Sequence, residues 1–429
     1  MGEDQDRVVV GLVLPQWGRV VRTGEDVPAW TVVGPDGLAL MPVAQFLREF
    51  AACGNAAGSV RSYAGALLRW CRFLQAVEVA WDRATPAEGR DFVLWMRQAT
   101  KPIAGRRTVT AATAGRVNPI TRKPYQGDGY ALRTIRHNNA VVRSFYEFFG
   151  ERGEGPLLNP MPRDRAGGLR AHAHHNPMAP FGFEGRLRYN PKVPLRRRRA
   201  LTDQQWGELF GVLRCDRDRA LLALAVSTAA RAGELLGLRS VDVDWGEQTI
   251  QVRRKGTGAA QWLPASPEAF VWLRLWIAEL GEIAGDDPVW QTRRRRSTGS
   301  GSPRRSVLTY DALRAMLRRA NATLATNWTL HDLRHTCALR LLRGHGVSLR
   351  DVQVVLGHAH LSTTQIYLEL DDGEVIARVH RHLAEREHPP APPRPAAGYD
   401  HDDLAVLLGS DVLGSDVRGG DVLGGDVIA

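Results

Sequence analysis

The sequence predicts a mainly α-helical protein with a small antiparallel β-sheet, divided into two domains. Its 429 residues, of which 44% are hydrophobic, suffice for two or three globular domains. Apolar residues recur at steps of three and four in both halves of the chain, as they do in amphipathic helices. A Pro- and Gly-containing stretch interrupts this pattern in the middle of the chain. We therefore expect an N-terminal extension (1–38), a helical domain (39–153), a linker with an insertion (154–198), a second domain (199–388) and a tail (389–429).

The helical domain begins after an extension whose apolar runs alternate with Gly and Asp, a pattern that allows a few short strands. Helical periodicity starts near Pro42 and continues from Ser59 through the stretch SVRSYAGALLRWCRFLQA. In that stretch a core-facing stripe is expected from Tyr63, Leu67, Trp70, Phe73 and Leu74. The runs DFVLWMRQA and YALRTIRHNNAVVRSFYEFFGE complete about four helices, with a long polar loop before the last.

The second domain opens with a new helix, because Thr202 and Gln205 form a capping box. An apolar helix follows, and we expect its C-terminal part to carry Arg231 and Glu234. The stretch TIQVRRKGTGAAQWLPAS predicts a strand, a Gly-rich turn and a second strand, with Lys255 at the turn. These charged residues also have explanations that involve no function. Arg231 and Glu234, three residues apart, are expected to form an ion pair if they share a helix, and a lysine in a turn is usually solvated.

Capping boxes mark three further helices. Thr329 and Asp332 predict a helix start that places His331 and Arg334 on one face of the first turns. Amides at a helix start carry partial positive charge and favour an anion.

The next helix begins at Ser348, ends at Gly357, and is followed by His358 in a turn. Ser362 and Gln365 then cap a helix that carries Tyr367.

Charge points to nucleic acid as a partner. The net charge is +11 with a pI near 10.0, and the basic residues are almost all arginine, which suits bidentate phosphate contact. The tail from Pro389 has a net charge of −5 and is expected to be disordered, which leaves +16 on the rest.

Neither an apolar run long enough to span a membrane nor a secretory signal is evident, so a cytoplasmic location is expected. The four cysteines lack metal-ligand spacing, and neither a metal nor a cofactor is expected.

Six positions together resemble the signature of the tyrosine recombinases, also called phage-type integrases. In order and spacing, they are Arg231 within ARAGE, Lys255 in the β-turn, His331 and Arg334 within HDLR, His358 after Gly357, and Tyr367 nine residues later. The resemblance covers about 199–385 and, more weakly, 40–152. Two positions depart from the family pattern: Ala229 stands where a Gly is usual, and Arg254 stands in place of the Gly that precedes the lysine.

The resemblance implies a two-domain clamp on double-stranded DNA, made of a helical core-binding (SAM-like) domain and a mixed α/β catalytic domain. Tyr367 would be the nucleophile that forms a covalent 3′-phosphotyrosyl intermediate. The family roles assigned to the other five positions are phosphate binding by Arg231 and Arg334, a hydrogen bond from His358, acceptance of the tyrosine proton by His331, and protonation of the leaving 5′ oxygen by Lys255. The family also implies a homotetramer on paired sites, with accessory DNA-bending or directionality proteins as further partners.

The sequence leaves several interpretations of the function open. The long N-terminal extension, the loop at 105–127 and the insertion at 155–195 favour the integrase or transposase of a mobile element over a housekeeping recombinase that resolves chromosome dimers. A type IB topoisomerase and a non-catalytic DNA-binding regulator are alternatives. His358-Ala-His360 followed by Tyr367 also resembles the metal-dependent HUH nucleases, but that reading leaves the two arginines and Lys255 unexplained.

Overall fold

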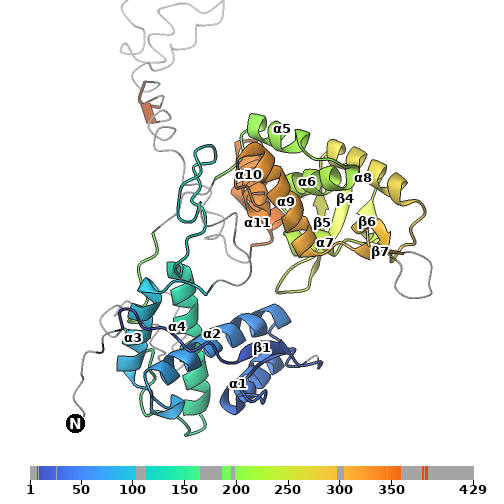
Figure 1. Ribbon diagram of the computed structural model, residues 1–429. Helices are drawn as coiled ribbons and strands as arrows, with labels where there is room; N and C mark the ends of the chain where they lie inside the picture. The colour runs from blue at the N-terminus through green and yellow to red at the C-terminus, as the bar shows by residue number, and fades with distance from the viewer. Residues whose placement is uncertain are drawn as a thin grey trace, which may run out of the picture. The chain divides into compact units, whose positions relative to one another are not determined.

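The computed structural model describes residues 7, 9–25, 27–102, 113–164, 186–194, 199–296, 304–344, 346–358, 379–380 and 382–384. Within these residues the chain is mainly helical (Figure 1), and its strands form three small antiparallel sheets. The predicted fold class is confirmed. Among the described residues, no helix combines the length and the apolar character needed to cross a membrane.

The helical domain is built around one long central helix. Its helices are α1 (Met41–Ala52), α2 (Ala57–Ala76), α3 (Pro86–Gln98) and α4 (Leu132–Gly150), with the 3₁₀ turn η1 (Trp81–Arg83) before α3. The predicted stripe on α2 is the core face, since Leu67, Trp70, Phe73 and Leu74 are all buried there. Aromatic rings from α3 and α4 pack on it, including Phe92 at 5.1 Å from Trp70 between ring centroids. These contacts confirm the four predicted helices.

The N-terminal extension contributes a β-hairpin to this domain. Strands β1 (Arg19–Arg22) and β2 (Trp30–Val33) pair antiparallel, and the buried Val32 belongs to the same hydrophobic core as α2. Arg72 of α2 donates from Nε to the carbonyl of Trp17 at 2.7 Å and from Nη2 to that of Gly18 at 2.9 Å. The expected short strands are therefore present and attached to the helices.

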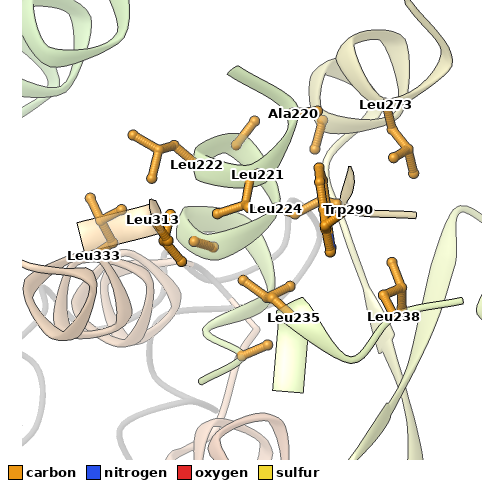
Figure 2. Close-up of a cluster of buried hydrophobic side chains, with 14 of the residues drawn as sticks. Ala220, Leu221, Leu222, Leu224, Leu235, Leu238, Leu273, Trp290, Leu313 and Leu333 are labelled. Carbon is orange, nitrogen blue, oxygen red and sulfur yellow. The ribbon is translucent and has the colours of Figure 1, made fainter. Parts of the chain in front are cut away.

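The second domain surrounds an almost completely buried helix. Its helices are α5 (Asp203–Gly211), α6 (Asp216–Thr228), α7 (Ala232–Leu236), α8 (Pro267–Leu280), α9 (Tyr310–Leu324), α10 (Leu330–Arg343) and α11 (Leu349–Leu356), with the 3₁₀ turn η2 (Ser240–Asp242). Figure 2 shows side chains of α6, such as Leu221 and Leu224, between Leu333 of α10 and Leu273 of α8. A helix that is apolar all round is buried on all sides, which explains its central position.

Two small sheets lie in this domain. Strands β3 (Val243–Asp244), β4 (Thr249–Arg253) and β5 (Ala260–Pro264) form an antiparallel sheet in the order β3-β4-β5, which confirms the predicted strand, turn and strand. Strands β6 (Gln291–Arg296) and β7 (Arg304–Val307) form a second antiparallel pair that the sequence did not predict, because its arginines hide any alternating apolar pattern.

One predicted helix boundary is wrong. Arg231 and Glu234 were expected on the C-terminal part of the apolar helix, but α6 ends at Thr228 and Arg231 is the residue before the separate helix α7. Ala229 adopts a left-handed conformation, with φ of +54°, and so turns the chain between the helices. A Gly at this position would have signalled the helix end, and the alanine conceals it.

Several predictions fall outside the described residues. They concern Tyr367 with its capping pair, most of the linker insertion, and the acidic tail from Pro389.

Candidate active site

Arg231 is held at the start of α7 by a carboxylate one turn further on. Its backbone N–H donates to Glu234 Oε2 at 2.8 Å, and its Nη1 donates to Glu234 Oε1 at 2.8 Å. The Arg231 side chain is 33% exposed, whereas that of Glu234 is 2% exposed. The ion pair that the sequence allowed is therefore present, and it leaves the outer part of the guanidinium accessible to a ligand.

Glu234 also binds the β4–β5 turn. Its Oε1 accepts the backbone N–H of Lys255 at 3.2 Å, and its Oε2 accepts Nη1 of Arg254 at 3.2 Å. Burial works to raise the pKa of Glu234, but the hydrogen bonds from Arg231 and the Lys255 N–H outweigh it, so that the pKa lies below its usual value. One ionised carboxylate thus ties the first candidate arginine to the turn that carries Lys255.

Lys255 lies in a tight turn directly after β4. The Arg254 N–H donates to the Ala259 carbonyl at 2.8 Å, and the Gly258 N–H donates to the Arg254 carbonyl at 2.9 Å. Gly256 and Gly258 have positive φ angles, which residues with a side chain rarely adopt. The turn leaves the side chain of Lys255 exposed to solvent.

His331 and Arg334 begin α10, as the capping box predicted. Asp332 accepts the Thr329 N–H at 2.7 Å and so caps the helix start. His331 is exposed at this start, and its ring lies 4.2 Å from that of the buried His335. Arg334 points inward and is only 3% exposed.

Arg334 connects three segments of the domain. Its Nη1 donates to the Ala229 carbonyl and its Nη2 to the Leu356 carbonyl, each at 2.5 Å. The same Nη2 lies 3.1 Å from Nε2 of His358. Since Ala229 stands two residues before Arg231, these contacts bring both candidate arginines and His358 to one place.

His358 follows a helix end of the predicted kind. Gly357 ends α11 in a left-handed conformation with φ of +59°. The His358 N–H then donates to the Gln353 carbonyl at 3.1 Å, and Gln353 Nε2 donates to the His358 carbonyl at 2.9 Å. These two bonds fix the backbone of the residue whose ring faces Arg334.

Hydrogen bonds therefore link Arg231 to the turn of Lys255, and Arg334 to His358 and to the segment before Arg231. His331 lies on α10 three residues before Arg334, and Tyr367 lies outside the described ranges. Sequence reasoning missed two supporting residues, Arg254 and Lys123. For Arg254, the sequence offered one indication, namely that an arginine stands where the family usually has a glycine. No local pattern marks Lys123, which reaches Asp332 from a distant loop, with 2.5 Å between Nζ and Oδ2.

That loop is a small hairpin within residues 113–125. The Asn118 N–H donates to the Lys123 carbonyl at 2.9 Å, and the Asn118 side chain donates to the Ala325 carbonyl at 2.7 Å. The Asn327 side chain donates to the Lys123 carbonyl at 3.0 Å. The hairpin thus supports the segment that leads into α10.

The assembled residues form a site for an anion. Arg231, Arg254, Lys255 and Arg334 bring four positive charges, and Glu234 neutralises one of them. Planar guanidinium groups suit the oxygens of a phosphate, and an exposed histidine and lysine can exchange protons. Such a set can bind a phosphodiester and stabilise negative charge on its oxygens.

A second polar surface lies on the helical domain. A groove of about 350 Å³ between α2 and α4 is lined by small and basic residues, among them Gly58, Arg61, Ser62, Arg69 and His137. Small residues let a ligand approach the helix backbone, and arginines favour an anionic one.

Comparison with known proteins finds matches in both halves of the chain. Residues 200–374 match the family model described as the phage integrase family, and residues 43–115 match the phage integrase N-terminal SAM-like domain. The tyrosine recombinase XerC of Pseudomonas aeruginosa is 34% identical over 224 residues, which cover 48% of this chain and 68% of that protein. The chain belongs to the tyrosine recombinase family. It is thus a recombinase of the tyrosine type.

Other members resemble this recombinase over longer segments. The tyrosine recombinase XerA of Pyrococcus horikoshii is 28% identical over 242 residues, covering 56% of this chain and 71% of that protein. The integrase of the transposon Tn1549, solved in complex with circular intermediate DNA, aligns with a TM-score of 0.50 and 15% identity over 78% of this chain and 98% of that one. At this identity the likeness concerns the fold alone.

Proposed function

We propose that this recombinase cleaves and rejoins DNA strands through a 3′-phosphotyrosyl intermediate formed by Tyr367. The observation that carries the proposal is the convergence of Arg231, Arg334 and His358, linked through the contacts of Arg334 with the Ala229 carbonyl and the His358 ring. These residues come from three separate helix ends, and no single helix explains their meeting.

Each residue has a part in a balanced reaction. The Tyr367 oxygen attacks the phosphorus and displaces the 5′ oxygen, so that one phosphodiester replaces another and no external energy is needed. The two arginines bind the non-bridging oxygens, which gain charge in the transition state, and His358 adds a hydrogen bond. His331 accepts the phenol proton, and Lys255 donates a proton to the departing 5′ oxygen. The reverse sequence rejoins the strands.

Double-stranded DNA is the proposed partner of both domains. The net charge of +11, the cationic catalytic site and the basic groove between α2 and α4 all support an extended anionic ligand. The solved Tn1549 integrase is bound to DNA. We infer that the protein closes as a two-domain clamp and acts as a homotetramer on paired sites, as its family does.

The direct experiment uses a suicide DNA substrate that traps the covalent adduct. Tyr367→Phe should abolish the adduct, whereas Tyr310→Phe should leave its yield unchanged, because Tyr310 is an exposed residue at the first position of α9 and is not one of the six predicted residues. An adduct of normal yield in Tyr367→Phe would disprove the nucleophile. The adduct should form in EDTA, which distinguishes this chemistry from that of the metal-dependent HUH nucleases.

The proposed biological role is the movement of a mobile element. The matched segment makes up 48% of this chain but 68% of XerC, so this chain is the longer of the two. The N-terminal hairpin β1–β2 precedes the two segments that the family models match. Amplification across the joined ends of the DNA around the gene should detect a circular or relocated element. Recombination confined to a single chromosomal site would instead favour a housekeeping resolvase, and relaxation of DNA without paired sites would favour a topoisomerase.

A further inference from the structure

Arg254 is buried directly beside the exposed Lys255. Its side chain is 7% exposed, although a charged side chain is seldom buried unless it is paired. Its Nε donates to Gln261 Oε1 at 2.7 Å, its Nη1 to Glu234 Oε2 at 3.2 Å, and its Nη2 to the Val355 carbonyl at 2.6 Å. All three guanidinium nitrogens are therefore bonded, and they reach three different elements.

The last of these bonds belongs to a set that caps the end of α11. The final carbonyls of a helix have no partner within the helix and carry partial negative charge. Here Gln261 Nε2 donates to the Val354 carbonyl at 3.0 Å, and Arg254 and Arg334 donate to the next two carbonyls. The helix end that leads into His358 is thus held by side chains of the β4–β5 hairpin and of α10.

Gly357 leaves the space that this arrangement needs. A Cβ atom at Gly357 would lie 2.8 Å from Arg254 Nε and 3.0 Å from its Cζ. The guanidinium therefore lies directly against the backbone of the turn before His358. Glycine is therefore required at position 357 for two reasons: it leaves room for the Arg254 guanidinium, and it allows the positive φ angle.

We propose that Arg254 is a positioning residue that fixes the β4–β5 turn, and with it Lys255, against the His358 turn at the end of α11. The inference rests on the proposed role of Lys255 as proton donor. Lys255 adjoins Arg254 in the chain, and the turn that follows contains two glycines with positive φ angles. Without the Arg254 bonds to Glu234 and Val355, the turn keeps the bond of Gln261 to the Val354 carbonyl and that of the Lys255 N–H to Glu234 Oε1. The lysine then samples a wider range of positions around the leaving oxygen.

The test compares two DNA substrates under single-turnover conditions with saturating enzyme. One carries the normal 5′-bridging oxygen, and the other carries a 5′-bridging sulfur, which leaves without needing a proton. A misplaced proton donor slows only the oxygen substrate. Arg254→Met should slow it by about 10- to 100-fold and leave the sulfur substrate within about threefold of wild type. Arg253→Met, which removes the exposed arginine that ends β4 next to Arg254, should leave the ratio of the two rates unchanged.

Lys255→Ala separates this inference from the proposed function. If sulfur restores cleavage by Lys255→Ala but Arg254→Met slows both substrates equally, Arg254 does not position the proton donor and the inference alone is overturned. If sulfur does not restore Lys255→Ala, Lys255 is not the proton donor, and both its role in the proposed function and this inference fail. The Tyr367 nucleophile is tested separately by the covalent adduct. Should Arg254→Met not fold, Gln261→Leu removes one acceptor of Arg254 and should raise the sulfur-to-oxygen rate ratio in the same direction. An unchanged ratio in a folded Gln261→Leu protein would then overturn the inference.

Discussion

Replacement of Glu234 by glutamine should destabilise the catalytic domain although it preserves the shape of the side chain. Each carboxylate oxygen accepts two N–H groups: Oε1 those of Arg231 Nη1 and the Lys255 backbone, and Oε2 those of Arg254 Nη1 and the Arg231 backbone. An amide has one acceptor oxygen, so in either orientation two of the four donors face an NH₂ group.

The magnitude follows from these lost bonds. A hydrogen bond to a charged group contributes about 1.5–3 kcal/mol, so two of them contribute about 3–6 kcal/mol. Water can reach Arg231, which is one-third exposed, but not Arg254, which is left as a buried charge without its counter-ion. We therefore expect Glu234→Gln to lower the free energy of unfolding by about 3 kcal/mol.

Guanidinium unfolding at pH 7, followed by circular dichroism, measures this loss. Glu279→Gln is the matched control, because Glu279 forms a surface pair with Arg293 at 3.0 Å and should cost no more than about 1 kcal/mol. Equal free energies of unfolding for the two variants would refute the role given to Glu234.

The pH dependence supplies a second measurement on the same variant. Because the pKa of Glu234 is lowered in the folded state, its contribution is fully present above the unfolded value of about 4.3 and is lost as the pH falls through the folded pKa. The difference between wild type and Glu234→Gln should therefore shrink below about pH 4. Other titrating groups are common to both chains and cancel in the difference. A difference that grows with acidity would contradict the assignment.

Three further changes test other parts of the molecule. Lys123→Met removes the ion pair with the largely buried Asp332 and should make the loop that carries Lys123 more susceptible to limited proteolysis; unchanged cleavage would separate the loop from α10. Leu67→Ala creates a cavity in the helical core and should lower the free energy of unfolding by about 3–5 kcal/mol. A loss of less than about 1 kcal/mol would show that Leu67 is loosely packed. Replacement of the exposed Arg294 and Arg295 of β6 by glutamine should reduce the salt slope of DNA binding by about 2, and an unchanged slope would place this strand away from the duplex.

The predicted helix starts in the second domain depend on contacts within four residues of the chain. The capping boxes at Thr202, Thr329 and Ser348 are present as expected, because each joins a side chain to a backbone group three residues away. Gly357 ends its helix for an equally local reason, the left-handed conformation that glycine allows. Where that signal is missing, as at Ala229, the sequence placed Arg231 on the wrong helix.

The mainly helical fold, the order of the site residues along the chain and their family could all be predicted from the sequence. The contacts that support these residues could not, because they form only when the domain packs. Arg254 meets the Val355 carbonyl across 101 positions of the chain, and Lys123 meets Asp332 across 209. Periodicity and capping report which face of an element is buried and where the element begins. Periodicity and capping do not predict which distant side chain binds a given carbonyl, because that depends on how whole helices and strands pack.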